Sequence, residues 1–207
     1  MGVSRQKAAE NHDAIIAAAE TLFRERGVEA VGLVELMAAA GLTRGGFYNH
    51  FASKGALVDE VVAEAMAEGF EDLTAAIEGS RARGEDPLGN QIDWYLSPEH
   101  RDDIDHGCPN AGFLGDAPRF EDPARAQYAT GLAANLRRFS EAVQETTGLD
   151  EDASWPRTLA LFSQMVGAVL LSRAVAGTDP DLAAQFLDSA RSDLHERAGD
   201  SSPRRAA

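Results

Sequence analysis

The chain has 207 residues, which is enough for one large or two small domains. Its composition favours helix-forming residue types and has few β-branched runs, so we expect an all-α protein. The net charge of −15 argues against strong non-specific binding of nucleic acid, and the single cysteine excludes a disulfide within the chain and suits a reducing compartment.

The negative charge is unevenly distributed. Residues 1–55 hold six basic and six acidic side chains, so the whole excess falls on residues 56–207. At a Debye length of about 8–10 Å, distant acidic groups oppose a local DNA contact only weakly. The first ten residues are polar, and the most apolar run, residues 165–171, is far shorter than the roughly 18 residues that cross a bilayer. We therefore expect a cytoplasmic protein without a signal peptide or a membrane partner.

Helical periodicity and capping residues predict about nine helices. In chain order they are expected near residues 11–26, 33–40, 43–50, 54–79 or 54–83, 87–96, 109–115, 122–147, 154–176 and 180–197. Thr43 and Ser53 are predicted to cap two of them, and Glu35 has the spacing of a capping box. An acidic, irregular loop is expected at residues 97–106, and a disordered tail at residues 199–207.

The second and third predicted helices are short and are joined by a tight turn that contains Gly41. This arrangement predicts a helix-turn-helix, whose second helix enters the DNA major groove. Tyr48, Asn49 and His50 form a polar cluster between two phenylalanines that we assign to the core. A helix that only packed into a core would have no use for such a cluster.

Residues 11–58 resemble the N-terminal domain of TetR-family transcriptional regulators. The matching pieces are Ile15–Ala19, Leu22-Phe23, Gly27, Leu36–Gly41, Thr43–Gly45, Phe47–Phe51, Ser53-Lys54 and Ala56-Leu57. A second, weaker resemblance, carried by Gly107-Cys108-Pro109, is to a group of members with this tripeptide after an acidic loop. The family resemblance implies a DNA-binding domain at residues 1–53 and a helical ligand-binding and dimerisation domain at residues 54–198. It also implies a non-enzymatic, cofactor-free repressor that binds a palindromic operator as a homodimer.

Seven residues are candidates for DNA contacts. Thr43 can donate its hydroxyl to a phosphate, and the guanidinium of Arg44 suits guanine or phosphate. Gly45 permits close approach of the backbone to DNA, and Asn49 is a plausible base reader. The resemblance implies phosphate contacts for three more residues, Tyr48, His50 and Lys54.

The eighth predicted helix is apolar on two faces, which requires burial on two sides. One face can pack within its own domain, and the other is predicted to form a four-helix interface with the last helix and with the same pair in a second chain. The predicted interface residues are Leu159, Val166, Val169, Leu170, Phe186, Leu187 and Leu194.

A pocket for a lipophilic or aromatic inducer is predicted from aromatic, sulfur and amide side chains. Its candidates are Trp94, Tyr95, Cys108, Phe113, Phe139, Phe162, Gln164 and Met165. Cys108 at a helix cap leaves open a thiol redox sensor, or less favourably a helical thiol-dependent enzyme using His106. The histidines and aspartates near Cys108 lack the spacing of a metal site, so we expect no bound metal.

Overall fold

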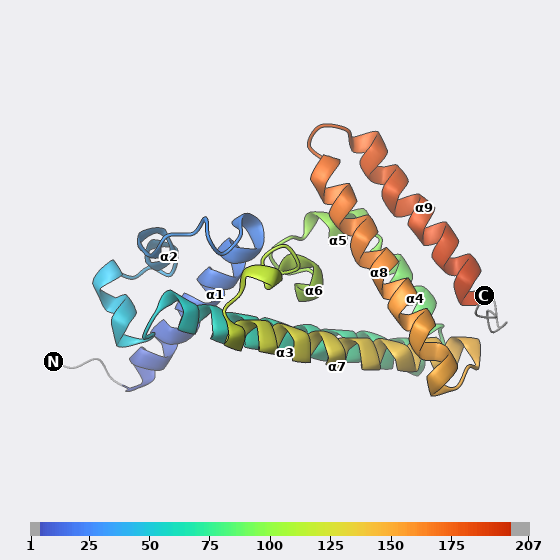
Figure 1. Cartoon of the computed structure of the whole chain (residues 1–207), viewed down its shortest axis with the longest axis horizontal. Coiled ribbons are helices and arrows are strands. Elements are labelled where there is room, and N and C mark those ends of the chain that lie inside the picture. Colours follow the sequence, from blue (N-terminus) through green and yellow to red (C-terminus); the bar gives the residue numbers. More distant parts are fainter. Residues whose placement is uncertain (1–4, 200–207) are drawn as a thin grey trace. The chain divides into compact units, whose positions relative to one another are not determined.

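The computed structural model describes residues 5–199, and all of the regular structure in that range is helical (Figure 1). The elements are α1 (Arg5–Arg26), α2 (Leu33–Ala39), η1 (Arg44–Asn49), α3 (Lys54–Ala82), α4 (Pro87–Tyr95), α5 (Pro98–Asp102), α6 (Pro109–Gly112), η2 (Ala117–Arg119), α7 (Asp122–Thr147), α8 (Glu151–Val175) and α9 (Pro180–Gly199). The two η elements are 3₁₀ helices. The all-α prediction is confirmed, whereas the predicted tail lies outside the described residues apart from Gly199.

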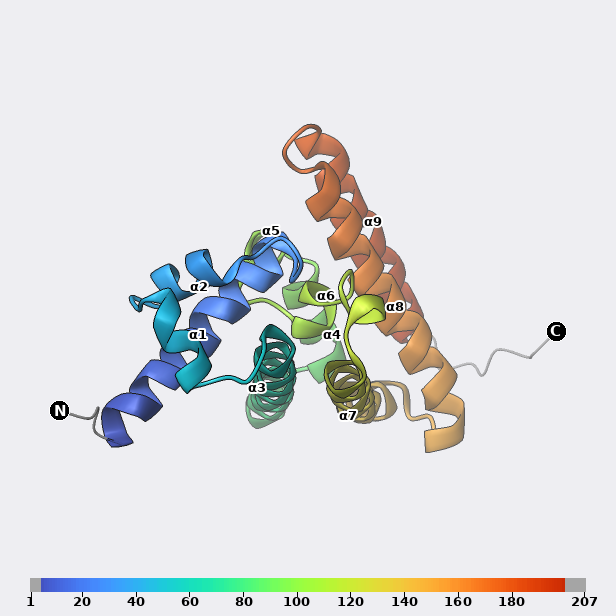
Figure 2. The same ribbon diagram turned by 60° about the vertical axis from the view of Figure 1, so that its left-hand side comes forward.

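The chain forms two compact units. Unit 1 comprises the described parts of residues 1–68 together with residues 104–131, and unit 2 comprises residues 69–103 with the described residues after 131. The long helices α3 and α7 lie side by side in both views, and each contributes turns to both units (Figure 1, Figure 2). The domain boundary that the sequence suggests at residue 53 stays a prediction.

Several helices begin where the sequence places a capping side chain. Ser53 Oγ accepts from the Ala56 amide at 3.0 Å, Asp86 Oδ1 from the Leu88 amide at 3.1 Å, and Asp179 Oδ1 from the Leu182 amide at 2.9 Å. These bonds satisfy amides of the first turn that have no partner within the helix. Thr43 takes the N-cap backbone position of η1, but its side chain makes no capping bond, contrary to expectation.

Several segments differ from the sequence-based expectation: α1 starts earlier than residue 11, α6 ends before residue 115, and η2 was not expected. Two further differences have an evident cause. The predicted acidic loop contains α5, because Ser97 Oγ accepts from the His100 amide at 3.1 Å and Pro98 occupies the first helical turn. Helix α8 starts at Glu151 rather than near Ser154, because the Asp150 side chain caps it through the Ala153 amide at 2.9 Å.

In unit 2, α8 and α9 form an antiparallel pair (Figure 1). Ser172 Oγ donates to the Ala183 carbonyl at 2.8 Å, and Gln164 Nε2 donates to Asp193 Oδ2 at 2.8 Å. Among residues 5–199, α8 alone is long and apolar enough to cross a membrane. A helix in a protein core meets the same criterion, and here one face of α8 packs on α9.

In unit 1, α7 approaches α3 closely at Gly131. A Cβ atom on Gly131 would lie 2.5 Å from Cβ of Met66, which real contacts do not allow. The glycine is therefore required by the close packing of the two long helices, and Met66 is buried beneath it.

Candidate nucleic-acid interface

The helix-turn-helix of unit 1 consists of α2, a turn and η1. Gly41 takes a left-handed conformation with φ of +70°, and the Leu42 amide donates to the Met37 carbonyl at 2.8 Å, which ends α2 and reverses the chain. Phe47 and Phe51 are both buried, with ring centroids 5.6 Å apart, as the sequence predicts. The second helix is a 3₁₀ helix, so it is tighter than an α-helix.

The predicted recognition residues lie mostly on the surface of this element. Tyr48 is 67% exposed and packs edge-on against Phe47, with ring centroids 5.3 Å apart. Arg44, Gly45 and Asn49 are exposed, and Thr43 is exposed just before them. A side chain on Gly45 would meet nothing within 4 Å. The element thus presents one cation, one phenol and one amide on a surface open to an approaching backbone.

His50 is only partly exposed, and a second histidine lies near it. The His12 ring stacks on Phe51 with centroids 4.6 Å apart, and its centroid lies 6.2 Å from that of His50. His12 Nε2 lies 3.1 Å from Glu60 Oε2 on α3. His12 therefore connects α1, the residues that follow η1, and α3, a role that the sequence did not suggest.

Lys54 is used differently from the phosphate contact that the family resemblance implies. Its Nζ donates to the Val28 carbonyl at 2.5 Å and to the Val31 carbonyl at 2.7 Å, and lies 5.8 Å from the centroid of Phe23. Two of the three N–H groups of the ammonium therefore donate to backbone carbonyls in the turn between α1 and α2. One donor is left for a phosphate, so a DNA contact by Lys54 stays a prediction.

Residues 104–131 also belong to unit 1, although they lie far from the helix-turn-helix in sequence. Asp116 Oδ2 accepts from the Val28 amide at 3.1 Å, so it holds the same turn as Lys54. Arg24, almost fully buried, pairs with Glu20 at 2.6 Å and also donates to the Gly107 carbonyl. No local sequence pattern predicts these contacts, because the two partners of each are more than 80 residues apart in sequence.

Cys108 lies at the N-cap position of the short helix α6, as predicted. It is half-buried, and its Sγ lies 3.5 Å from Nδ2 of Asn110. The Asn110 carbonyl accepts from the Tyr128 hydroxyl at 2.8 Å. Burial, with a smaller contribution from Cys108, raises the pKa of Tyr128 to about 12.

The predicted pocket residues do not form one group. Cys108 and Phe113 belong to unit 1, and the other six candidates belong to unit 2. In unit 2, Phe139 packs against Phe162 with centroids 6.0 Å apart, whereas Trp94 is 52% exposed. Gln164 is bonded to Asp193, so its amide is engaged within the chain. Their role as an inducer pocket stays a prediction.

The predicted interface residues divide by burial. Val166, Val169, Leu187 and Leu194 are buried in the core of unit 2. Leu159 is exposed, and Leu170 and Phe186 are partly exposed. The first four therefore belong to the core of unit 2, and an interface role for the other three stays a prediction. Within residues 5–199 there is no group of three or more histidine, cysteine or acidic side chains suited to a metal ion.

Comparison with known proteins matches residues 15–61 to the bacterial regulatory proteins, tetR family. The HTH-type transcriptional repressor DhaR of a Mycobacterium species is 26% identical over 77% of this chain and 80% of its own length. The HTH-type transcriptional repressor BepR of Brucella suis is 40% identical over 62 residues, which are 30% of either chain. In its fold, the chain resembles the reduced form of Escherichia coli NemR, with a TM-score of 0.72 and 19% identity over 90% of this chain and 96% of that one.

Proposed function

Because the chain is a member of the TetR family of transcriptional regulators, we propose that it is a cytoplasmic homodimeric repressor that binds a palindromic operator. A small molecule, lipophilic or aromatic, would release it from DNA. The observation that carries this proposal is the surface of η1. Arg44, Tyr48 and Asn49 are exposed together on an element anchored by the buried Phe47.

The chemistry of this surface suits a specific rather than a purely electrostatic DNA contact. With residues 1–55 electrically neutral, the attraction to phosphate rests on few cations, chiefly Arg44. Asn49 is able to pair with adenine, and Arg44 with guanine or phosphate. Binding should therefore be weak on random DNA and depend on two correctly spaced half-sites.

Dimerisation is supported by an apolar stripe on α8 that α9 does not cover. The stripe contains the exposed Leu159 and the 51% exposed Leu171, which flank the small residues Ser163 and Gly167. A Cβ atom on Gly167 would meet nothing within 4 Å, so a helix from a second chain is able to approach closely there. Leu182 at the start of α9 is also exposed and extends the apolar surface.

Release by a ligand is proposed in preference to thiol chemistry or catalysis. The aromatic pair of the buried Phe139 and the partly exposed Phe162 in unit 2 is a candidate for contact with an apolar inducer. Cys108 keeps the redox-sensor alternative open. A thiol-dependent enzyme is disfavoured, because it would have no need of the exposed recognition element and because the relatives are named as transcriptional repressors.

A gel-shift experiment with the DNA upstream of the protein's own gene tests the proposal. Wild type should bind this DNA at nanomolar concentration and bind shuffled DNA at least a hundredfold more weakly, as roughly expected for a specific regulator. Arg44→Met should weaken binding, whereas Arg137→Met, which removes an exposed arginine from α7, should not. Equal binding to both DNAs, or equal effects of the two substitutions, would count against a sequence-specific repressor.

A further inference from the structure

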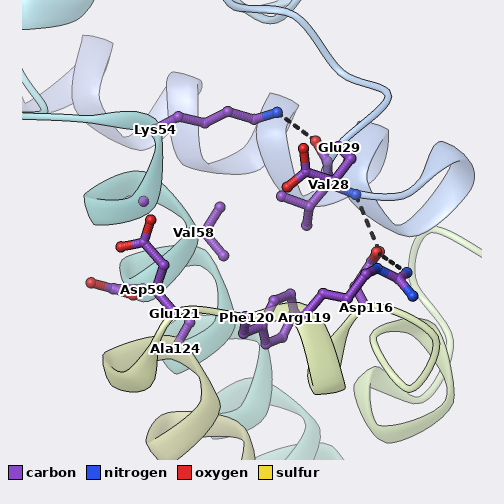
Figure 3. Close-up of a pocket in the computed structure, with 11 residues that line it drawn as sticks. Val28, Glu29, Lys54, Val58, Asp59, Asp116, Arg119, Phe120, Glu121 and Ala124 are labelled. Carbon is purple, nitrogen blue, oxygen red and sulfur yellow. Dashed lines mark hydrogen bonds and ion pairs between the residues drawn. The ribbon is translucent and has the colours of Figure 1, made fainter.

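Unit 1 contains a partly open cavity of about 140 Å³ between the start of α3, the turn after α1 and residues 116–124 (Figure 3). Its apolar lining residues include Val58 and Phe120. The lining residues are Val28, Glu29, Lys54, Gly55, Val58, Asp59, Asp116, Arg119, Phe120, Glu121 and Ala124. None of the eight residues predicted for an inducer pocket is among them.

The positive charges at this cavity are engaged within the protein. Lys54 donates to the carbonyls of Val28 and Val31, and Arg119 forms an ion pair with Asp116 at 2.8 Å. Asp116 also accepts from the Val28 amide, so its carboxylate is satisfied on both oxygens. Arg119 and Asp116 thus form an ion pair without net charge, whereas Lys54 keeps its charge but directs two of its three donors to backbone carbonyls.

Three carboxylates remain around the cavity. Asp59 and Glu121 lie together on one side of it, and Glu29 lies on the turn after α1 (Figure 3). Oδ1 of Asp59 is shielded from water and has no hydrogen-bond partner among the described residues. A buried carboxylate oxygen without a donor is unfavourable, and a donor in the cavity would satisfy it once the Asp59 side chain turns toward the cavity.

Glu121 lies close to Gly55 at the start of α3. A Cβ atom on Gly55 would lie 3.0 Å from Oε2 of Glu121, so a larger residue would make the carboxylate shift by a few tenths of an ångström. The missing side chain brings the Glu121 carboxylate against the first turn of α3. Two carboxylates from different parts of the chain thus line the same cavity as Val58 and Phe120.

We propose that this cavity binds a small organic cation, specifically a short alkylammonium ion. The ammonium would donate to Asp59 and Glu121, and its alkyl part would lie against Val58 and Phe120. A metal ion fits less well, because no group of metal-ligating side chains suited to one exists among residues 5–199. The volume corresponds to about four or five water molecules, which accommodates an amine of about six non-hydrogen atoms.

Calorimetric titration of the full chain with 3-methylbutylammonium chloride tests the assignment. The neutral alcohol 3-methylbutan-1-ol has nearly the same shape and serves as the matched ligand. The amine should bind at least tenfold more tightly than the alcohol at constant ionic strength, because only the amine carries a charge for the two carboxylates. Equal affinity for both, or no heat from 10 mM amine, would overturn the proposal.

Substitutions locate the site. Asp59→Asn and, separately, Glu121→Gln should each weaken amine binding by about tenfold or more. Glu71→Gln removes the same charge from an exposed position on α3 outside the cavity and should leave the affinity unchanged. Glu121 is exposed, so its variant should fold even if Asp59→Asn does not. An equal loss in Glu71→Gln would mean general charge attraction, and that result would also overturn the proposal. The measurement requires no DNA and does not depend on the repressor function.

Discussion

The substitution Lys54→Met separates two roles for one lysine. In the structure, the ammonium donates to two backbone carbonyls of the turn between α1 and α2, at 2.5 and 2.7 Å. Each hydrogen bond from a charged donor contributes about 1.5–3 kcal/mol when its partner is buried. Lys54 is half-buried, and water would replace part of this loss, so we expect a decrease of about 2 kcal/mol in the free energy of unfolding.

Urea denaturation followed by circular dichroism measures this decrease directly. A loss of about 2 kcal/mol also corresponds to a melting temperature roughly 4–8 °C lower for a chain of this size. Arg44→Met is the matched control, because it removes an exposed cation from the same module. It should leave the free energy of unfolding unchanged and lower the salt slope of operator binding by roughly 0.9.

The outcome decides between the two roles. Unchanged stability in Lys54→Met would refute the reasoning that its two carbonyl contacts hold the turn. If the salt slope then fell as in Arg44→Met, the phosphate contact implied by the family resemblance would be the main role of Lys54. A loss of stability with an unchanged slope would establish the structural role instead.

Three further predictions address other parts of the chain. Leu171→Glu should halve the mass measured by light scattering without loss of helicity, because a charge on the exposed stripe of α8 would be buried in a dimer. Glu151→Gln at the start of the same helix should leave the mass unchanged. An unchanged mass in Leu171→Glu would place the interface elsewhere. Cys108→Ser should retain operator binding and ligand release, because serine is favoured at an N-cap and its oxygen is able to accept from Asn110; release of wild type by peroxide that this variant resists would instead support the redox sensor. In spectrophotometric titration, Tyr128 should ionise near pH 12, and the absorbance change in that range should be smaller in Tyr128→Phe. Because the pKa of Tyr128 is higher in the folded state, its contribution to stability should be complete below about pH 10 and be lost as the pH approaches 12; a titration with all tyrosines near pH 10 would contradict its burial.

Local signals predicted much of the fold. Asp-Pro pairs gave the starts of α4, α7 and α9, because a capping carboxylate and a proline both act within one helical turn. The same signal at Ser97-Pro98 predicts α5, but the acidic residues that follow had been interpreted as a loop. Pro156 suggested a later start for α8, although an early turn of a long helix tolerates a proline when Asp150 already caps the helix.

Local signals of this kind do not predict the long-range contacts within unit 1. Lys54 reaches carbonyls 23 and 26 residues away, and Asp116 reaches an amide 88 residues away. Neither contact follows a helical period, and the receiving atoms belong to the backbone, which carries no sequence information. The recognition surface was easier, because buried Phe47 and exposed Tyr48 follow from alternating polar and apolar chemistry within one short element.

Unit 1 is built from two separate stretches of the sequence, and this matters for hybrid proteins in which its helix-turn-helix is joined to another chain. A chimera joined at residue 53 would contain the helix-turn-helix but not Asp116 or Gly107. The Val28 amide and the Arg24 guanidinium would then lose these hydrogen-bond acceptors. Transplanting residues 104–131 together with residues 1–68 would carry these partners along. The exchangeable piece of this protein is therefore discontinuous in sequence, and a hybrid built from it needs three junctions, after residues 68, 103 and 131, rather than a single cut.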